Sequence, residues 1–409
     1  MYIHSMRHPR RIDLVPLRPS EPTPAVKGRG SAWAIEHRFN ALRHDAEDDG
    51  WGRENPAVDE RPLAPQAPVT QVIEETARSV LSANESPDIH FDLSVNPYRG
   101  CEHGCIYCFA RPTHSYLNLS PGIDFETRIV AKTNVAERLR AALASRRYVP
   151  RLLNIGSATD AYQPVERRLR LTRGVIEVLH ACRHPFSLVT KSAGVERDLD
   201  LLRDMAAWRA VGIYVSLTTL DPALARQMEP RAAAPHRRLQ TIATLAEAGV
   251  PVGVSLSPMI PFLNEPELER LLEAAARAGA GRAFMGVLRL PWEVNPLFQD
   301  WLARHHPERA ARVMARVREL HGGQDYDARF GQRQRGRGVW AELLRQRFDK
   351  ACARLGLRQE RTPLDFSQFR PPPPVPPGAR PSGGPAAPDE ADGPVAPAPA
   401  PAARQRSLF

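Results

Sequence analysis

The feature that most constrains the fold is a regular alternation of two kinds of segment between residues 89 and 290. Short runs of apolar and β-branched residues, which favour strands, are each followed by a longer run with helical spacing. The expected strands are Ile89–Val95, Arg151–Gly156, Phe186–Thr190, Val211–Leu217, Val250–Leu256 and Arg282–Leu288. The expected helices are Asn134–Arg147, Glu166–Cys182, Glu196–Trp208, Pro235–Ala248 and Pro266–Ala278. Six such units with short connections predict an α/β fold with a parallel sheet and outer helices, either open or curled into a partial barrel.

The distribution of proline separates this repeating part from the two ends of the chain. Of the 40 prolines in 409 residues, nine fall in residues 1–70 and thirteen in residues 371–409. We expect a largely irregular extension over 1–85, a core over 86–290, a helical part over 291–370 that packs on the core, and a disordered Pro/Ala-rich tail over 371–409. No run approaches the roughly 18 apolar residues of a membrane span. The first residues also lack the apolar stretch of a signal peptide, which predicts a cytoplasmic protein.

The excess positive charge lies between the two ends. The chain carries 56 Lys+Arg against 46 Asp+Glu, a net charge of +10. Residues 1–85 hold 11 basic and 13 acidic side chains, and residues 371–409 hold three of each. The remaining residues, 86–370, therefore hold 42 basic and 30 acidic side chains, a net charge of +12. A positive charge concentrated in residues 86–370 favours an anionic partner such as nucleic acid. A compositional bias that places arginines on solvated helix faces explains the same count.

Three of the five cysteines, Cys101, Cys105 and Cys108, fall within eight residues directly after the first expected strand. Clustered thiols in a chain without a secretion signal indicate a metal or catalytic site rather than a disulfide framework. Three thiolates suit three irons of a [4Fe-4S] cluster and leave one iron open for a small ligand. The alternative is a zinc site completed by His103 or His114.

The spacing C-x3-C-x2-C, with an aromatic residue before the last cysteine, resembles the signature of radical S-adenosylmethionine (SAM) enzymes. Its flanks resemble the spore photoproduct lyase-like group, often labelled DNA repair photolyase, and read Asn96-Pro97-Tyr98-Arg99-Gly100-Cys101 and Tyr107-Cys108-Phe109-Ala110-Arg111. The likeness runs from about Asp92 to Leu290. It implies an incomplete (β/α)6 TIM-like barrel in which Cys101, Cys105 and Cys108 bind a [4Fe-4S] cluster. Its unique iron would chelate SAM, and reductive cleavage would give methionine and a 5′-deoxyadenosyl radical.

The same resemblance implies which residues hold SAM. Tyr107 would lie beside the adenine, and the turn Gly156-Ser157-Ala158-Thr159-Asp160 would bind the methionine part. Lys191 and Ser216 would hold the carboxylate and the ribose. Taken alone, each is a polar group at the carboxyl end of a strand, and a lysine after an apolar strand needs an anionic partner. The alternatives are a salt bridge from Lys191 to Glu196, and turn or helix capping by Ser157, Thr159 and Ser216.

The hydrogen donor departs from the resemblance. Spore photoproduct lyase uses a cysteine beyond the cluster loop, near the second strand, as its hydrogen donor. This chain has no cysteine between Cys108 and Cys182. The candidate catalytic donors are therefore Tyr98, Tyr107 and Tyr116, and the substrate stays open.

The last five residues resemble a docking peptide. Gln405, Ser407, Leu408 and Phe409 match the Gln-Leu-Ser/Asp-Leu-Phe motif by which bacterial polymerases and repair proteins bind the sliding clamp, although Arg406 replaces the usual leucine. A spacer that presents two terminal apolar side chains suits such docking. A ragged terminus is the alternative.

Three functions follow from these patterns. The first is a radical SAM enzyme that acts on nucleic acid and takes electrons from a reductant such as flavodoxin or ferredoxin. The second keeps the chemistry but modifies RNA or protein, and the third is a metal-stabilised nucleic-acid-binding module without catalysis. The segment Gly28–Trp51 either covers the barrel mouth or is disordered.

Overall fold

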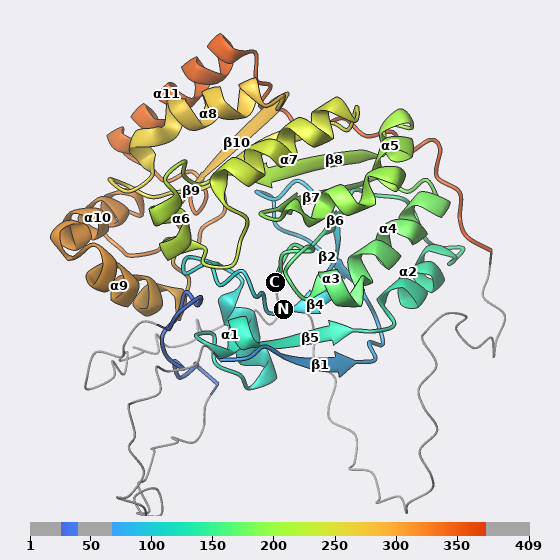
Figure 1. Ribbon diagram of the computed structural model, residues 1–409, viewed down its shortest axis with the longest axis horizontal. Helices are drawn as coiled ribbons and strands as arrows, with labels where there is room; N and C mark the ends of the chain where they lie inside the picture. Colours follow the sequence, from blue (N-terminus) through green and yellow to red (C-terminus); the bar gives the residue numbers. More distant parts are fainter. Residues whose placement is uncertain (1–25, 40–67, 374–409) are drawn as a thin grey trace, which may run out of the picture.

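The six expected strands run parallel in one sheet, as the alternation predicts (Figure 1). The computed structural model describes residues 26–39 and 68–373. The parallel strands are β3 (Leu93–Val95), β6 (Leu153–Ile155), β7 (Phe186–Thr190), β8 (Val211–Ser216), β9 (Val252–Met259) and β10 (Arg282–Val287). The sheet order is β10-β9-β8-β7-β6-β3-β2, where β2 (Leu81–Ala83) is antiparallel to β3. Among the described residues β10 and β2 do not pair with each other, so the barrel is incomplete.

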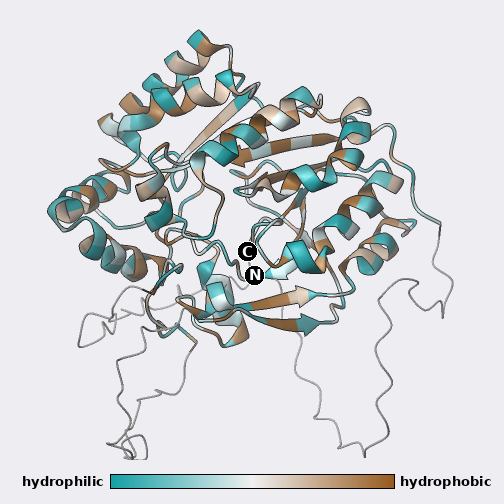
Figure 2. Cartoon of the chain, viewed as in Figure 1, coloured by the Kyte–Doolittle hydropathy of each residue, from teal (hydrophilic) through white to brown (hydrophobic). Residues whose placement is uncertain are grey.

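The strands are buried because both faces of the sheet are covered. Every residue of β8 is buried, and Figure 2 shows this strand as largely hydrophobic. Continuous apolar runs of this kind are typical of parallel strands under helices. The surrounding helices carry both hydrophilic and hydrophobic residues in Figure 2, as amphipathic helices on such a sheet should.

The helices follow their strands as expected, with one correction. They are α2 (Val135–Leu143), α3 (Glu166–Leu169), α4 (Leu171–Ala181), α5 (Leu199–Ala207), α7 (Pro235–Glu247) and α8 (Leu268–Arg277). The single helix expected over Glu166–Cys182 is wrong, because Arg170 has a left-handed backbone with φ 53° that separates α3 from α4. The Glu166 carboxylate accepts hydrogen bonds from the backbone N–H of Thr172 and Arg173, at 3.0 and 3.3 Å. The carboxylate thereby satisfies the free donors at the start of α4.

A second, smaller sheet was not expected from the sequence. Its order is β1-β5-β4, formed by β1 (Gln71–Glu75), β5 (Arg128–Lys132) and β4 (Tyr98–Arg99). The segment before residue 86, expected to be largely irregular, therefore contains the two strands β1 and β2. The short helix α1 (Asp124–Thr127) leads directly into β5.

Residues after β10 form a helical part that closes one side of the barrel. It contains α9 (Val294–His305), α10 (Pro307–Leu320) and α11 (Val339–Leu355), and α11 packs on α8. The remaining helix, α6 (Pro222–Met228), follows β8 and belongs to the barrel. In α9, Phe298 and Trp301 are buried. Within the described ranges, no helix is both long and apolar enough to cross a bilayer.

The loop between α10 and α11 bridges the two unpaired edges of the barrel. The Gln334 carbonyl accepts a hydrogen bond from the backbone N–H of Val287 in β10, at 2.9 Å. Next to it, the Arg333 guanidinium donates to both oxygens of Asp88, at 2.8 and 2.5 Å, in the turn between β2 and β3. Burial acts to raise the pKa of Asp88, but the hydrogen bonds from Arg333 outweigh it and lower this pKa to about 2.

Candidate active site

The three-cysteine loop connects β4 to the short 3-10 helix Arg111–Leu117. Cys101 and Cys105 are buried, and Cys108 is half-buried. Gly104 between them has φ +67°, and a Cβ at this position would lie 2.6 Å from the Glu126 carboxylate. A side chain here is excluded both by the backbone conformation and by the close carboxylate. The loop can therefore wrap tightly around a bound group.

A fully buried arginine holds the loop in this conformation. Arg111 donates to the carbonyl of Cys105 at 2.9 Å and to that of Gly104 at 3.1 Å. The same guanidinium pairs with the buried Glu126 carboxylate at 2.5 Å. An arginine presents several donors in a fixed planar fork, so a single side chain fixes two loop carbonyls and one carboxylate.

The start of the described chain lies against this scaffold. We call residues 26–39 the N-terminal strap. The backbone N–H groups of Gly30 and Ser31 donate to the Glu126 carboxylate, each at 2.9 Å. Ile35 packs in the apolar cluster that contains Cys105. The segment Gly28–Trp51 was expected either to cover the barrel mouth or to be disordered. Its described part, residues 28–39, contacts the cysteine loop through Gly30, which lies against Gly104, and residues 40–51 lie outside the described part of the chain.

A second set of hydrogen bonds joins the cysteine loop to the turn after β6. Thr159 Oγ1 donates to the carbonyl of Gly100 at 2.6 Å. Gln163 accepts from the backbone N–H of Glu102 at 2.8 Å and donates to the Gly100 carbonyl at 3.3 Å. The turn and the loop therefore keep a fixed relative position.

The turn itself is shaped by Asn96, which directly follows β3. Asn96 donates to the Ser157 hydroxyl at 3.1 Å and accepts from the backbone N–H of Ala158 at 2.9 Å. Gly156 has φ +80°, and a Cβ there would come within 2.9 Å of the Thr159 carbonyl. Only glycine fits this tight turn without strain.

Asp160 connects the turn to the end of β7. Its carboxylate accepts hydrogen bonds from Thr190 Oγ1 at 2.7 Å and from the backbone N–H groups of Lys191 and Tyr162 at 2.8 and 2.9 Å. His103 Nδ1 of the cysteine loop lies 3.3 Å away. Burial acts to raise the pKa of Asp160, but His103 and these donors outweigh it and hold the pKa well below the usual range. Asp160 is thus an ionised acceptor that links three parts of the site.

A buried group of charges lies beneath the cysteine loop. Glu229 accepts hydrogen bonds from the Tyr107 hydroxyl and from Thr218, the latter at 2.8 Å, and pairs with the buried Arg238. Arg238 also donates to the Ser216 carbonyl at 3.1 Å. Burial acts to raise the pKa of Glu229, but Arg238 outweighs it and leaves the pKa lowered. Sequence reasoning missed both charged residues.

Lys191 approaches the same group from the end of β7. Its Nζ lies 5.8 Å from the centre of the Tyr107 ring. Burial acts to lower the pKa of Lys191, but Cys105 and Glu229 outweigh it and leave the pKa raised. The alternative salt bridge to Glu196 is wrong, because Glu196 pairs with Arg237 at 2.6 Å. Within the described residues no carboxylate lies within ion-pair distance of Lys191, so this half-buried ammonium can still pair directly with an anion.

The three candidate hydrogen donors lie in different surroundings. Tyr98 is fully buried, and its hydroxyl donates to Glu166 below the loop. Tyr107 is buried and bonded to Glu229. Tyr116, by contrast, is exposed on the 3-10 helix after the cysteines.

The donor set fits an iron–sulfur cluster better than a single metal ion. No three His, Cys, Asp or Glu side chains converge on one ion-sized position in the described part of the chain. In a [4Fe-4S] cluster each thiolate holds a different iron, so such convergence is not required. Of the two imidazoles of the zinc alternative, His114 already has its Nε2 2.9 Å from the Arg128 carbonyl, and His103 has its Nδ1 3.3 Å from Asp160.

Burial also sets the protonation of the thiols. It raises the pKa of Cys105 to about 12 and that of Cys101 well above its ordinary value. Without iron these two thiols keep their protons at neutral pH. Because thiolate is the ligand, iron binding must release protons at this site.

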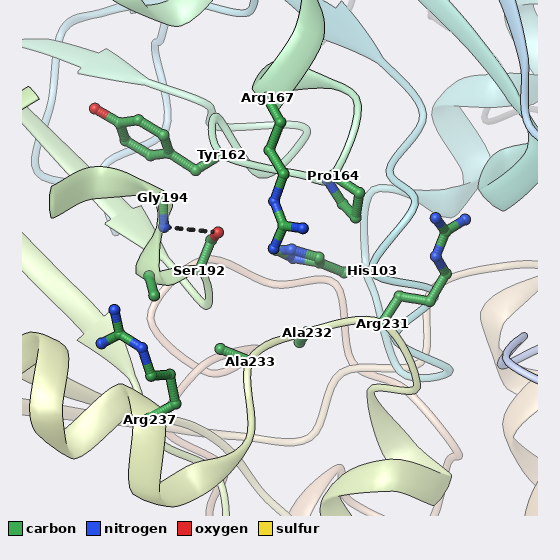
Figure 3. Close-up of a pocket in the computed structure, with 11 residues that line it drawn as sticks. His103, Tyr162, Pro164, Arg167, Ser192, Gly194, Arg231, Ala232, Ala233 and Arg237 are labelled. Carbon is green, nitrogen blue, oxygen red and sulfur yellow. Dashed lines mark hydrogen bonds between the residues drawn. The ribbon is translucent and has the colours of Figure 1, made fainter. Parts of the chain in front are cut away.

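A cationic pocket of about 420 Å³ opens beside the cysteine loop (Figure 3). It is lined by residues that follow β6, β7 and β8, together with His103 of the loop. Arg231 pairs with Glu102 at 3.0 Å, and Arg237 pairs with Glu196. Arg167 is exposed, reaches toward His103 in Figure 3, and has no carboxylate within ion-pair distance among the described residues.

Comparison with known proteins gives the family and the fold of the chain. Residues 95–275 match the family model described as the Radical SAM superfamily. An uncharacterized protein of Mycobacterium bovis is 40% identical over 233 residues, which are 56% of this chain and 67% of that protein. An uncharacterized protein of Methanocaldococcus jannaschii is 25% identical over 197 residues, which are 48% of this chain and 71% of that protein.

Solved structures give the same fold. Spore photoproduct lyase complexed with dinucleoside spore photoproduct has a TM-score of 0.51 and 16% identity, and the match covers 70% of this chain and 81% of that chain. At this identity the likeness concerns the fold alone. An incomplete barrel with a three-cysteine loop at the carboxyl ends of its strands defines a class of cofactor-dependent enzymes. The chain belongs to the radical SAM superfamily, whose members use a [4Fe-4S] cluster and SAM.

Proposed function

We propose that this enzyme binds a [4Fe-4S] cluster through Cys101, Cys105 and Cys108, binds SAM beside it, and acts on nucleic acid in a repair-like reaction. One observation carries the cofactor part. A fixed loop with three thiols lies at the carboxyl end of the barrel next to Lys191, a half-buried ammonium with no described carboxylate within ion-pair distance. When bound, the reduced cluster supplies the electron that cleaves SAM to methionine and a 5′-deoxyadenosyl radical.

The residues around the loop suit the different parts of SAM. Lys191 offers a charge for the carboxylate, and the turn Gly156–Asp160 would bind the methionine part. Because the Asp160 carboxylate already accepts three hydrogen bonds, we assign it to holding the turn rather than to direct contact. Tyr107 would lie beside the adenine, and Ser216, buried at the end of β8, would lie beside the ribose.

The nucleic-acid part of the proposal rests on charge. Residues 86–370 carry a net charge of +12. Arg167, Arg231 and Arg237 line the pocket next to the cysteine loop. Arginine suits phosphate because its planar donors match phosphate oxygens.

Tyr107 and Tyr116 stay candidate hydrogen donors, and Tyr98, enclosed with Glu166, is the weakest of the three. The reaction also needs a reductant, and the clamp peptide, which lies outside the described residues, stays a prediction.

The experiment is anaerobic purification and reconstitution with iron and sulfide. We expect a brown protein with iron–sulfur absorbance that releases 5′-deoxyadenosine from SAM when dithionite is added. Replacing Cys101, Cys105 and Cys108 by alanine should remove both the colour and the product. A colourless protein that binds stoichiometric zinc would contradict the proposal.

The substrate class needs a second measurement. SAM cleavage by the reconstituted enzyme is compared with and without single-stranded DNA, duplex DNA, RNA and a protein fraction. Stimulation by nucleic acid, weakened by added salt, supports phosphate contacts. Stimulation by the protein fraction alone would contradict the nucleic-acid part and leave the cofactor part standing.

A further inference from the structure

Three exposed aromatic rings gather around one arginine beside the cysteine loop. The guanidinium of Arg38 lies 4.7 Å from the ring centre of Phe39, 5.5 Å from that of Tyr116 and 4.4 Å from that of Trp292. The exposed fractions of these aromatic residues are 51%, 56% and 57%. They come from the N-terminal strap, the 3-10 helix after the cysteines and the segment after β10. Large exposed aromatics that converge from three parts of a chain mark an interaction site.

The arginine at the centre is held in place by a buried carboxylate. Arg38 Nη1 donates to both oxygens of Glu293, each at 3.0 Å, and Glu293 is buried. The guanidinium plane is therefore fixed before any ligand arrives. A fixed cation among aromatic rings favours stacking on a flat, electron-rich ligand.

Trp292 carries a second, independent sign of function. Its backbone has φ +46°, in the left-handed region that bulky residues rarely adopt. Strain of this kind persists where the surroundings impose it, and it concentrates at binding sites. The indole of this residue lies at the surface.

A further aromatic–arginine pair lies on the cysteine loop itself. Phe109 directly follows Cys108 and is exposed, and the guanidinium of Arg289 lies 4.9 Å from its ring centre. Arg289 comes just after β10 and three residues before Trp292. Both groups therefore belong to the same end of the barrel, where the proposed reaction takes place.

We propose that Phe39, Tyr116 and Trp292, centred on Arg38, form a platform on which unpaired nucleobases of the substrate stack. The proposal rests on the proposed function, because it assigns the form in which nucleic acid reaches the site. Every base has a flat face that stacks on an aromatic ring, whereas paired bases inside a duplex do not offer that face. The platform thus selects single-stranded or locally opened nucleic acid over duplex.

The test measures binding of a fluorescently labelled single strand and of the matching duplex to cluster-loaded enzyme, by anisotropy. Phe39→Ala and Trp292→Ala should each weaken single-strand binding by at least about fivefold, the size of one lost base stack. Duplex binding should change little, and Trp292→Phe should restore most of the lost affinity. SAM cleavage without nucleic acid should stay at the wild-type rate.

Phe330→Ala is the matched control, because Phe330 is also 57% exposed and has a guanidinium, that of Arg333, 4.8 Å from its ring centre. It should leave single-strand binding unchanged. Two results would overturn the platform and leave the proposed function standing, provided that the wild-type enzyme binds nucleic acid. Either both platform variants bind the single strand as tightly as wild type, or they lose affinity for strand and duplex equally. A wild-type enzyme that binds neither strand nor duplex overturns both.

Discussion

Single buried side chains determine whether the cysteine loop keeps its shape. Arg111 illustrates this, since it satisfies two loop carbonyls and the buried Glu126 at once. The sequence predicts the three thiols from their spacing alone. It does not predict Arg111 or the Glu229–Arg238 pair, because their roles depend on contacts between segments that only the folded chain brings together.

Replacing Arg111 by lysine tests this dependence. Lysine keeps the charge but lacks the planar fork, so the carbonyls of Gly104 and Cys105 lose donors in a buried position. We expect stability to fall by about 1–3 kcal/mol and iron content after reconstitution to fall with it. Arg304→Lys, at a half-exposed pair with Asp300, is the control and should behave like wild type. Full iron content in Arg111→Lys would argue against the scaffold.

A second prediction at this scale concerns Lys191. If its ammonium binds the SAM carboxylate, Lys191→Gln should weaken SAM binding by at least about tenfold, as expected for a charge-assisted hydrogen bond. Calorimetric titration of cluster-loaded enzyme measures the dissociation constant. Glu196→Gln should leave it unchanged, because Glu196 pairs with Arg237 and not with Lys191. Equal effects of the two substitutions would contradict the assignment.

At the scale of elements, the hydrophobic pattern predicts the strands that are buried in the sheet. It does not predict helix breaks that depend on a hydrogen bond to a single side chain. The run Val211–Ser216 is readable as a strand because all of it is buried. The break at Arg170 is not readable, since it depends on where the Glu166 carboxylate points. β1 was missed because its partner β5 lies far along the chain and because a proline-rich stretch directly precedes it.

The junction of α4 and β7 gives a pH dependence. His184 is fully buried, and burial lowers its pKa to about 4. In the unfolded chain the pKa is about 6.5. As the pH falls from about 6.5 to 4, the unfolded state binds a proton that the folded state does not, so stability falls. The loss should be on the order of 3 kcal/mol and is complete near the folded pKa.

Urea unfolding at several pH values between about 7 and 4 measures this loss. His184→Gln should flatten the pH dependence relative to wild type. Part of the slope should remain, because burial also lowers the pKa of His114 to about 4. An unchanged slope in His184→Gln would contradict the assignment to His184.

For the whole molecule, the N-terminal strap joins the barrel to the cysteine loop. A Cβ at Gly30 would overlap the carbonyl of Gly104, so the two backbones touch. Trp33 and Ile35 of the strap pack in the same apolar cluster as Cys105 and Cys108. The strap therefore covers apolar surface around the thiols that water and oxygen would otherwise reach.

Deleting residues 1–39 removes the strap and should shorten the lifetime of the reconstituted cluster in air several-fold, followed as decay of its absorbance. Deleting residues 1–25 is the matched control and keeps the strap intact. Its cluster should decay at the wild-type rate. Equal lifetimes in the two truncations would show that the strap does not protect the site.

The contact between the strap and Glu126 also bears on how the enzyme is made. The backbone N–H groups of Gly30 and Ser31 close over the carboxylate that fixes Arg111, and with it the loop. The contact between strap and carboxylate is therefore part of what holds the loop in the shape that binds iron. Cluster loading is then sensitive to anything that pulls the strap away from Glu126. A bulky fusion partner joined directly before the strap should therefore yield folded enzyme with little iron.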